Sequence, residues 1–197
     1  MIFHYNYPIN ISKISHITKL KKLEILDFGC GIGNWLPHDV NLKKIKKIIL
    51  YDNNSNLKNL LKKKYSNKKF NIEFNYKNIK KKKFNVVIFS SVIQYIHAQQ
   101  LKKIINDLKK NKKKLFIIFI DVPHLPRILE LFLLPFFNLK RFLYVLKLIF
   151  LSEYKKINFF IYRKNSFNIF KSKFNLIFSK NLHDLKFLRY SLIMKLK

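Results

Sequence analysis

Glycine, cysteine and alanine are scarce in this sequence. Three glycines occur among 197 residues, where average usage would give about 14, and Ala98 is the only alanine. The single cysteine, Cys30, cannot form an internal disulfide, which favours a reducing compartment. The first ten residues, MIFHYNYPIN, lack the basic start, apolar run and cleavage site of a signal peptide. We therefore expect a cytoplasmic protein.

Acidic residues are also few, and the net charge is +31. Such a charge commonly indicates a nucleic-acid or anionic-membrane partner. The excess is almost entirely lysine, since arginine occurs only at Arg127, Arg141, Arg163 and Arg189. Lys, Asn, Ile and Phe have A/T-rich codons, so a biased genome explains the excess without a partner. This composition does not favour nucleic acid as the main partner, although weak, salt-dependent attraction of polyanions is expected.

The spacing of apolar residues predicts one α/β domain over residues 1–197. No internal repeat and no Ser-, Gly- or Pro-rich linker divides the chain. Through residue 124, short apolar runs typical of buried strands alternate with helical spacing, which favours a parallel sheet. The predicted strands are LEILDFG, Lys47–Tyr51, KFNIEFNY, FNVVIFSS and KKLFIIFIDVPH. The predicted helices are ISKISHITKL, SNLKNLLKKKY and IQYIHAQQLKKIINDLKK.

The alternation stops after residue 124. Residues 128–151 are long and apolar enough to suggest a membrane span, but charged residues interrupt them and Pro135 breaks them. We therefore predict a helical lid over residues 125–165. The alternative is a peripheral contact of 128–151 with a membrane surface, with lysines facing the headgroups. The tail predicts a helix from Ser166 and two strands, KFNLIFS and RYSLIMKL.

All three glycines lie in the stretch DFGCGIGNW, residues 27–35. In a sequence that otherwise avoids glycine, this cluster indicates a backbone that cannot tolerate side chains. Asp27, Asp52 and Asp121 follow apolar strand runs, and the carboxyl ends of parallel strands are where ligands bind. A glycine loop followed by an acid at the end of the second strand is typical of a nucleoside site, because a carboxylate there can accept hydrogen bonds from ribose hydroxyls.

The glycine spacing separates two kinds of nucleoside site. The dinucleotide fingerprint needs glycine at its first, third and sixth positions, and here the sixth is Asn34. The pattern Asp-x-Gly-x-Gly-x-Gly instead resembles the first motif of the class I S-adenosylmethionine-dependent methyltransferases. The resemblance extends over residues 20–121, through IILYD and FNVVIFSSVIQYIH. It implies a Rossmann-like fold: a mostly parallel, seven-stranded sheet with helices on both faces and a closing antiparallel strand pair within residues 157–197.

The resemblance also implies a cofactor, S-adenosylmethionine, and the residues that bind it. Asp27 would hold the methionine amino group, Asp52 the ribose hydroxyls, and Ser90 and Ser91 would line the sulfonium side. The glycines Gly29, Gly31 and Gly33 would pass beneath the methionine and ribose. The family commonly has an acid near the third strand end that contacts adenine, and here the candidates for that contact are Asn75 and Asn78. Cys30 is expected only to pack in the turn.

An oxygen acceptor usually requires a base. The candidates are His124, His97 and Asp121, and His124 is favoured because it directly follows a strand. No carboxylate cluster indicates a catalytic metal.

The absence of several motifs narrows the range of possible methyl acceptors. The chain lacks the Asn/Asp-Pro-Pro-aromatic motif of amino methylation of bases, a cysteine for covalent cytosine chemistry, and the Lys-Asp-Lys-Glu set of ribose 2′-O enzymes. We therefore predict O-methylation of a small molecule (a sugar, a lipid-linked compound or another metabolite) in a pocket roofed by residues 1–20 and 125–165. The alternatives are an RNA methyltransferase and a non-catalytic or membrane-associated protein that kept the fold.

Overall fold

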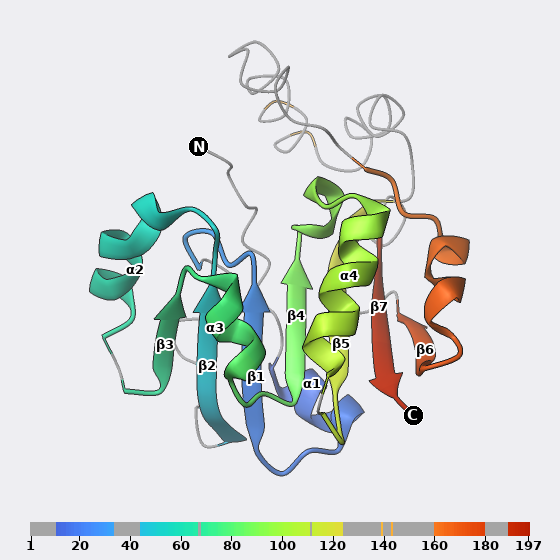
Figure 1. Ribbon diagram of the computed structural model, residues 1–197, viewed down its shortest axis with the longest axis horizontal. Helices are drawn as coiled ribbons and strands as arrows, with labels where there is room; N and C mark the ends of the chain where they lie inside the picture. The colour runs from blue at the N-terminus through green and yellow to red at the C-terminus, as the bar shows by residue number, and fades with distance from the viewer. Residues whose placement is uncertain are drawn as a thin grey trace.

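The computed structural model describes residues 11–33, 44–66, 68–110, 112–123, 139, 143, 160–179 and 189–197. These residues build one seven-stranded sheet in the order β3-β2-β1-β4-β5-β7-β6 (Figure 1). The strands are β1 Leu23–Phe28, β2 Ile45–Tyr51, β3 Phe70–Glu73, β4 Val86–Ser90, β5 Phe116–Pro123, β6 Phe174–Ser179 and β7 Arg189–Leu196.

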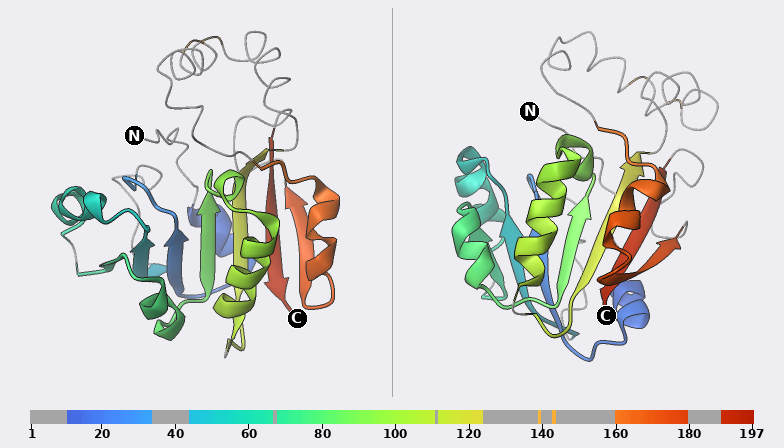
Figure 2. Two further views of the ribbon diagram at one scale, coloured as in Figure 1. Left: turned by 45° about the horizontal axis from the view of Figure 1, so that its top comes forward. Right: turned by 45° about the vertical axis from the view of Figure 1, so that its right-hand side comes forward.

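The first five strands are parallel, and β7 runs antiparallel between β5 and β6. This confirms the predicted mostly parallel, seven-stranded sheet and its closing antiparallel pair. Helices cover both faces, as expected for a parallel sheet whose central strands β1, β4 and β5 are almost entirely buried (Figures 1 and 2). The helices are α1 Ile11–Thr18, α2 Lys58–Lys64, α3 Tyr76–Lys81 and α4 Ala98–Lys109, with shorter 3-10 turns η2 Ser55–Leu57, η3 Ile93–Tyr95 and η5 Lys164–Phe170.

Two apolar layers form the core, one on each face of the sheet. On one face, Ile79 of α3, Ile105 of α4 and Phe167 of η5 pack against the strands. On the other face, Ile14 of α1 and Leu61 of α2 are fully buried. Alternate residues of the same strands belong to the two layers. Because the strands are packed on both faces, their ends are held in a fixed arrangement.

Several predicted boundaries differ from the structure. The strand predicted at Lys47–Tyr51 begins two residues earlier, at Ile45, where it pairs with Leu23 of β1. The α3 helix was not expected from the sequence, and the tail helix begins at Lys164 as a 3-10 turn.

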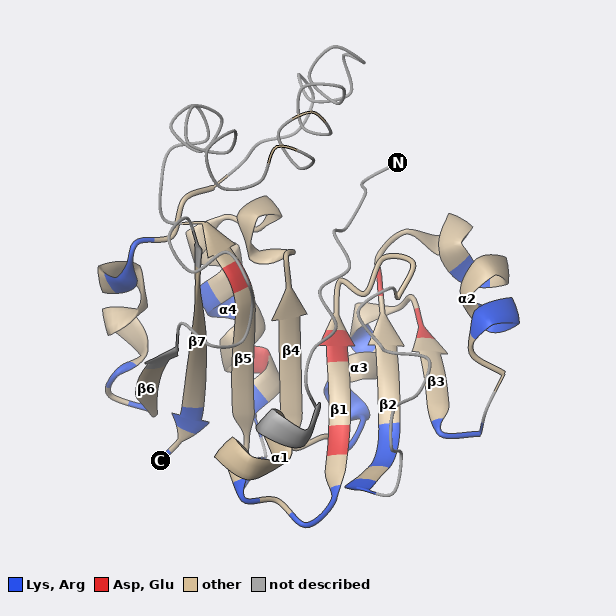
Figure 3. Ribbon diagram, turned by 180° about the vertical axis from the view of Figure 1, so that it is seen from behind, with Lys and Arg blue, Asp and Glu red and all other residues tan. Residues whose placement is uncertain are grey.

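The structure corrects the predicted position of the roof, residues 1–20, and describes only a small part of the predicted lid, residues 125–165. Helix α1, the described part of the predicted roof 1–20, lies on the sheet face opposite α4 and toward the amino ends of the strands (Figure 3). Residues 11–18 therefore do not cover the carboxyl ends. Residues 124–138, 140–142 and 144–159, which hold most of the predicted lid, lie outside the described residues. Within the described part of the chain, no helix is long and apolar enough to cross a membrane.

Candidate functional site

The glycine loop is bound to the end of β2 through main-chain hydrogen bonds. The N–H groups of Gly29 and Cys30 both donate to the carbonyl of Tyr51, at 2.8 and 2.9 Å. Gly33 N–H donates to the carbonyl of Cys30 at 2.8 Å, which closes a tight turn. The loop therefore folds back over the neighbouring strand end, as a nucleoside cradle requires. Residues 34–43, which follow the loop, lie outside the described residues.

Asp52 joins this loop to the β2 end. Its Oδ2 accepts a hydrogen bond from Gly31 N–H at 2.8 Å, and its Oδ1 accepts one from Asn54 N–H at 2.9 Å. Each carboxylate oxygen has two lone pairs, so both oxygens can still accept a hydrogen bond from a ligand hydroxyl. Asp52 is thus oriented by the backbone before any ligand arrives.

Two of the glycines are required by close contacts as well as by backbone angle. Gly29 has φ +76°, and a Cβ built there would lie 2.4 Å from Cγ2 of Val92. Gly33 has φ +70°, and its Cβ would lie 2.7 Å from the ring of Tyr65. An L-residue is disfavoured at these angles, and the neighbouring side chains leave no space for one. Glycine is therefore required at both positions by the packing of the loop against Val92 and Tyr65.

Two side chains at the C-terminal end of α2 donate hydrogen bonds to carbonyl groups of the glycine loop. The Tyr65 hydroxyl donates a hydrogen bond to the carbonyl of Gly33, and Lys64 Nζ donates one to the carbonyl of Ile32 at 3.2 Å. Burial, with the nearby charge of Asp27 and of Cys30, raises the pKa of Tyr65 to about 12. The phenol therefore stays protonated at neutral pH and remains a donor.

Cys30 lies inside this turn, close to Asp27 at the end of β1. Burial and then the charges of Asp27 and Asp52 raise the pKa of the Cys30 thiol well above its usual value. The thiol is 4% exposed and packs in the apolar layer that contains Ile14 and Leu61. We expect Cys30 to react much more slowly with a thiol reagent such as DTNB in the native protein than in guanidinium, because burial and a high pKa both suppress the thiolate. It is the only cysteine, so the absorbance reports it alone; equal rates would contradict the packed position.

The ends of β4 and β5 meet beside the glycine loop. Ser91 Oγ donates a hydrogen bond to Asp121 Oδ2 at 2.7 Å, and both residues are nearly fully buried. Both have positive φ, +54° for Ser91 and +64° for Asp121, and the β5–β7 register shifts at this point. Strained backbone and bulges are typical of functional sites at strand ends. The predicted residues Ser91 and Asp121 are therefore in direct contact, and Ser90 pairs with Ile120 next to them.

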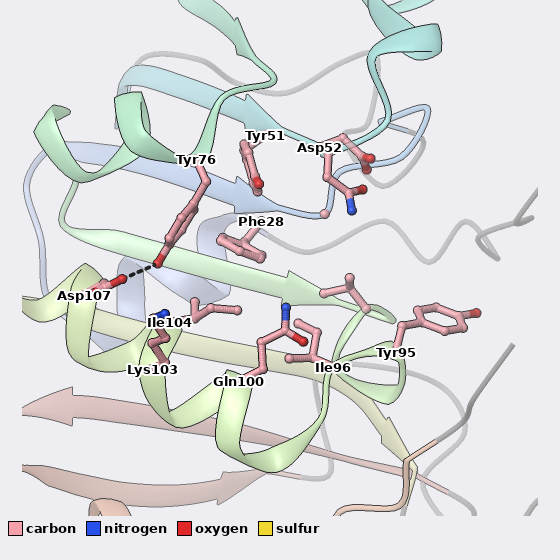
Figure 4. A pocket seen from close by; sticks show the side chains of 13 residues that line it. Phe28, Tyr51, Asp52, Tyr76, Tyr95, Ile96, Gln100, Lys103, Ile104 and Asp107 are labelled. Atoms are coloured by element: carbon pink, nitrogen blue, oxygen red, sulfur yellow. Dashed lines mark hydrogen bonds between the residues drawn. The ribbon is translucent and has the colours of Figure 1, made fainter.

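A cavity of about 550 Å³ opens at this edge of the sheet, between the strand ends and helices α3 and α4 (Figure 4). Apolar and aromatic side chains dominate its wall, and Asp52 and Gln100 lie on opposite sides of it. Of the predicted cofactor residues, Gly29 and Asp52 line it. Asp27, Gly31, Gly33, Ser90 and Ser91 lie in the surrounding loop and strand ends rather than in the wall.

The asparagines suggested for adenine do not line the cavity. Asn75 caps α3 by accepting a hydrogen bond from Lys77 N–H, and Asn78 donates to Glu73. Polar groups in the wall instead include Asn53 and Gln100, which sequence reasoning missed. Asn53 directly follows Asp52, which was a usable signal, whereas Gln100 is brought in only by the packing of α4.

One side of the cavity carries a small polar network. The Tyr76 hydroxyl donates to Asp107 Oδ2 at 3.3 Å, and Lys80 Nζ lies 2.7 Å from the same oxygen (Figure 4). The hydrogen bond from Lys80 is the main cause that lowers the pKa of Asp107. This network fixes α3 and α4 across the cavity. It too had no signal in the sequence, since α3 was not expected.

The predicted bases lie in different surroundings. His97 is the N-cap of α4, where its Nδ1 accepts a hydrogen bond from Gln99 N–H at 3.3 Å, and its ring contacts Phe160 edge-on. Asp121 is 4% exposed and hydrogen-bonded to Ser91. His124 lies outside the described residues. No group of three His, Cys, Asp or Glu side chains that could hold a metal occurs in the described ranges.

Residues 124–159 leave and rejoin the described fold beside the cavity. Tyr162 N–H donates to the carbonyl of Pro123 at 3.1 Å, and Phe160 N–H donates to the carbonyl of Gln94 at 2.8 Å. The Tyr162 hydroxyl also donates to the carbonyl of Ile96, which belongs to the cavity wall. Both ends of the segment are thus fixed at the carboxyl end of β5.

A family model described as a methyltransferase domain matches residues 4–156. No curated protein sequence matches the chain.

Three solved structures show the likeness. An S-adenosylmethionine-dependent methyltransferase from Clostridium acetobutylicum is 14% identical, with a TM-score of 0.60, over 94% of this chain and 89% of that one. Magnesium protoporphyrin IX methyltransferase from Synechocystis, solved with bound SAM, is 12% identical, with a TM-score of 0.58, over 95% and 76%. A chain of the Pnkp1/Rnl/Hen1 RNA repair complex is 13% identical, with a TM-score of 0.55, over 95% and 40%. At these identities the likeness shows the fold.

Proposed function

Since the chain belongs to the class I S-adenosylmethionine-dependent methyltransferases, we propose that it methylates a hydroxyl group of a small, partly apolar molecule. S-adenosylmethionine supplies, when bound, a methyl group on a sulfonium and leaves as a neutral thioether. The protein has mainly to align the acceptor with that methyl group, and such alignment can account for much of the rate.

The residues present fit the cofactor. Gly29 and Asp52 both border the cavity, and the Asp52 carboxylate keeps lone pairs for the hydroxyls of a ligand. We assign Asp52 to the ribose hydroxyls and Asn53 or Gln100 to adenine. Asp27, Gly29, Gly31 and Gly33 remain the proposed binding residues for the methionine half. Ser90 and Ser91 keep their proposed place beside the sulfonium.

The hydrogen bond from Tyr65, just after α2, to the glycine loop leads to a testable prediction. Replacing Tyr65 with phenylalanine removes the hydrogen bond to Gly33 and keeps the ring, so we expect a loss of about 1 kcal/mol in the free energy of unfolding. Because we assign this loop to the cofactor, the affinity of the Tyr65→Phe variant for S-adenosylhomocysteine, measured by calorimetry, should also fall severalfold.

Tyr190→Phe is the matched control for Tyr65→Phe. Tyr190 donates a similar buried hydrogen bond to the carbonyl of Tyr162, away from the glycine loop. It should lose comparable stability in urea denaturation and keep the affinity of the unmodified protein. Equal affinity in both variants would show that the hydrogen bond from Tyr65 does not position the loop.

The observation that supports a partly apolar acceptor is the wall of the described cavity. Apolar and aromatic side chains dominate it, among them Phe28, Tyr95 and Ile96. A molecule that enters this cavity therefore meets apolar surface, which favours an acceptor with an apolar part.

Asp121 is the base that we favour among the described residues. Its carboxylate is buried at the end of β5 and oriented by the hydrogen bond from Ser91, so it can accept the proton of an acceptor hydroxyl. In the neutral form of His97, the bond from Gln99 places the proton on Nε2, which leaves no free basic nitrogen. His124 stays a candidate from the sequence.

The test is transfer of a labelled methyl group from S-adenosylmethionine into a cell extract, followed by separation of metabolite, lipid and RNA fractions. We expect label in the metabolite or lipid fraction that survives RNase. Label that disappears with RNase would instead support the second candidate, an RNA methyltransferase. The net charge of +31 favours that candidate, and one chain of similar fold belongs to an RNA repair complex.

A further inference from the structure

Lysine side chains crowd the end of the sheet where the parallel strands begin, opposite the cavity. In Figure 3 the ribbon is coloured blue at lysine positions along the lower edge of the molecule, in the turns between strands and helices. We call this surface the basic pole; it consists of the lysines within 21–22, 68–69, 81–83, 112–114, 171–173 and 195–197. Turns far apart in the sequence thus place one sign of charge on one end of the fold.

Among the described residues, two acidic side chains reach this pole: Glu24, and Glu73, whose Oε2 lies 3.4 Å from Nζ of the pole residue Lys82. Glu24 lies there, and it already pairs with Lys46 at 2.8 Å. The other four described acids lie toward the carboxyl ends of the strands or in the cavity wall: Asp27, Asp52, Asp107 and Asp121. A/T-rich codons explain an excess of lysine, but they do not explain why so few of the described acids are near the pole lysines.

Some of the pole lysines are held close to one another. Lys112 Nζ donates to the carbonyl of Lys82 at 2.7 Å and lies 4.2 Å from the centre of the Phe84 ring, so it is fixed in place. Burial and the neighbouring ammonium of Lys173 lower the pKa of Lys109. The C-terminal ends of α3 and α4 offset part of this charge through their dipoles. A bound polyanion would offset the remainder.

We propose that the basic pole binds the phosphate backbone of a nucleic acid. The pole presents lysines rather than arginines, so it matches phosphates by charge and offers no fork for reading base edges. The large apolar side chains that are exposed in the described structure are Leu60, Leu139, Leu143, Ile161, Ile169 and Ile177, and none belongs to the turns of the pole. The pole therefore lacks side chains to insert into a bilayer, which disfavours a membrane.

The position of the pole decides what such binding does. The cavity opens at the carboxyl ends of the strands, and the pole lies at the amino ends. Nucleic acid bound there is not presented to the cofactor, so it tethers the protein instead of accepting the methyl group. The proposal goes beyond the methyl transfer proposed above, and either can fail without the other.

Charge reversal at two ends of the molecule tests the proposal. The pole variant carries Lys83→Glu, Lys113→Glu and Lys173→Glu, and the control carries Lys58→Glu, Lys62→Glu and Lys63→Glu in η2–α2, away from the pole. All six side chains are exposed, and both variants change the net charge equally. Binding of fluorescein-labelled single-stranded RNA and duplex DNA is measured by anisotropy against salt. Calorimetry with S-adenosylhomocysteine checks that each variant is folded.

We expect the pole variant to bind at least about tenfold more weakly and to lose about 1 from the log–log salt slope for each phosphate-contacting lysine removed, while the control changes little. The tighter of the RNA and DNA probes identifies the class of nucleic acid. Equal weakening in the two variants would overturn the proposal, because it would show attraction by net charge alone. Binding of phosphatidylserine vesicles without binding of either nucleic acid would also overturn it.

A measurement on the unmodified protein does not depend on the folding of any variant. Acetylation of lysines by a succinimidyl ester, read by mass spectrometry, should slow at Lys83, Lys113 and Lys173 when RNA is bound. It should continue at Lys62 and Lys63. Uniform protection, or protection of α2 alone, would contradict the pole as the binding surface.

Discussion

Replacing Asp52 with alanine is expected to raise the dissociation constant of S-adenosylhomocysteine by about 100-fold or more. Asp52 borders the cavity, and its carboxylate is oriented by Gly31 and Asn54. A hydrogen bond to a charged group contributes about 1.5–3 kcal/mol, and we assign two ribose hydroxyls to this carboxylate. Each 1.4 kcal/mol changes the dissociation constant tenfold, so loss of both bonds gives the expected factor. Isothermal titration calorimetry measures it directly.

Glu73 provides the matched control for Asp52. It ends the neighbouring strand β3, and its carboxylate also accepts hydrogen bonds from main-chain N–H groups, those of Phe74 and Asn75. It does not line the cavity. Glu73→Ala should therefore destabilise its turn to a similar extent and leave cofactor affinity within about twofold. If the two variants lose equal affinity, the Asp52 effect is one of loop stability and the ribose assignment is wrong.

The strand ends could be predicted from the sequence because their signals are local. Apolar runs that stop at Asp52 or at Gly29 mark the ends of β2 and β1 without any knowledge of tertiary contacts. The glycine cluster then pointed to a cofactor, since a close backbone approach requires glycine whatever packs around it. The alternation of elements likewise predicted a parallel α/β sheet, whereas its seven strands and the closing antiparallel pair were implied by the resemblance to the methyltransferase family.

The parts of the site that depend on packing between distant segments could not be predicted. Ser91 and Asp121 are thirty residues apart, and only the pairing of β4 with β5 brings them together. Gln100 enters the cavity wall because α4 packs beside the strand ends, whereas its spacing on the helix indicates only an exposed position. Helix α1 was expected at the mouth, but Ile14 is buried on the opposite face of the sheet. Its amphipathic pattern predicts a covered apolar face and does not say which surface covers it.

Gly29 should be the glycine least tolerant of a side chain. Gly29→Ala forces an L-residue to φ +76° and places a Cβ 2.4 Å from Val92 Cγ2. The backbone conformation costs about 1–2 kcal/mol and the overpacking about 1–3 kcal/mol. Together these approach the whole stability of a marginal domain. We therefore expect a large loss in the free energy of unfolding in urea, with cofactor affinity lost in parallel because Gly29 lines the cavity.

A double-mutant cycle with Val92→Ala separates the two causes. Truncating Val92 removes the atoms that would lie 2.4 and 3.4 Å from the new Cβ and keeps its own Cβ, at 3.1 Å. In that background Gly29→Ala should recover about 1–3 kcal/mol, the steric part, while the cost of positive φ remains. No recovery would show that the backbone angle alone requires glycine at this position. Full recovery would show that the loop can turn away from positive φ, and then the glycines are there for space rather than for conformation.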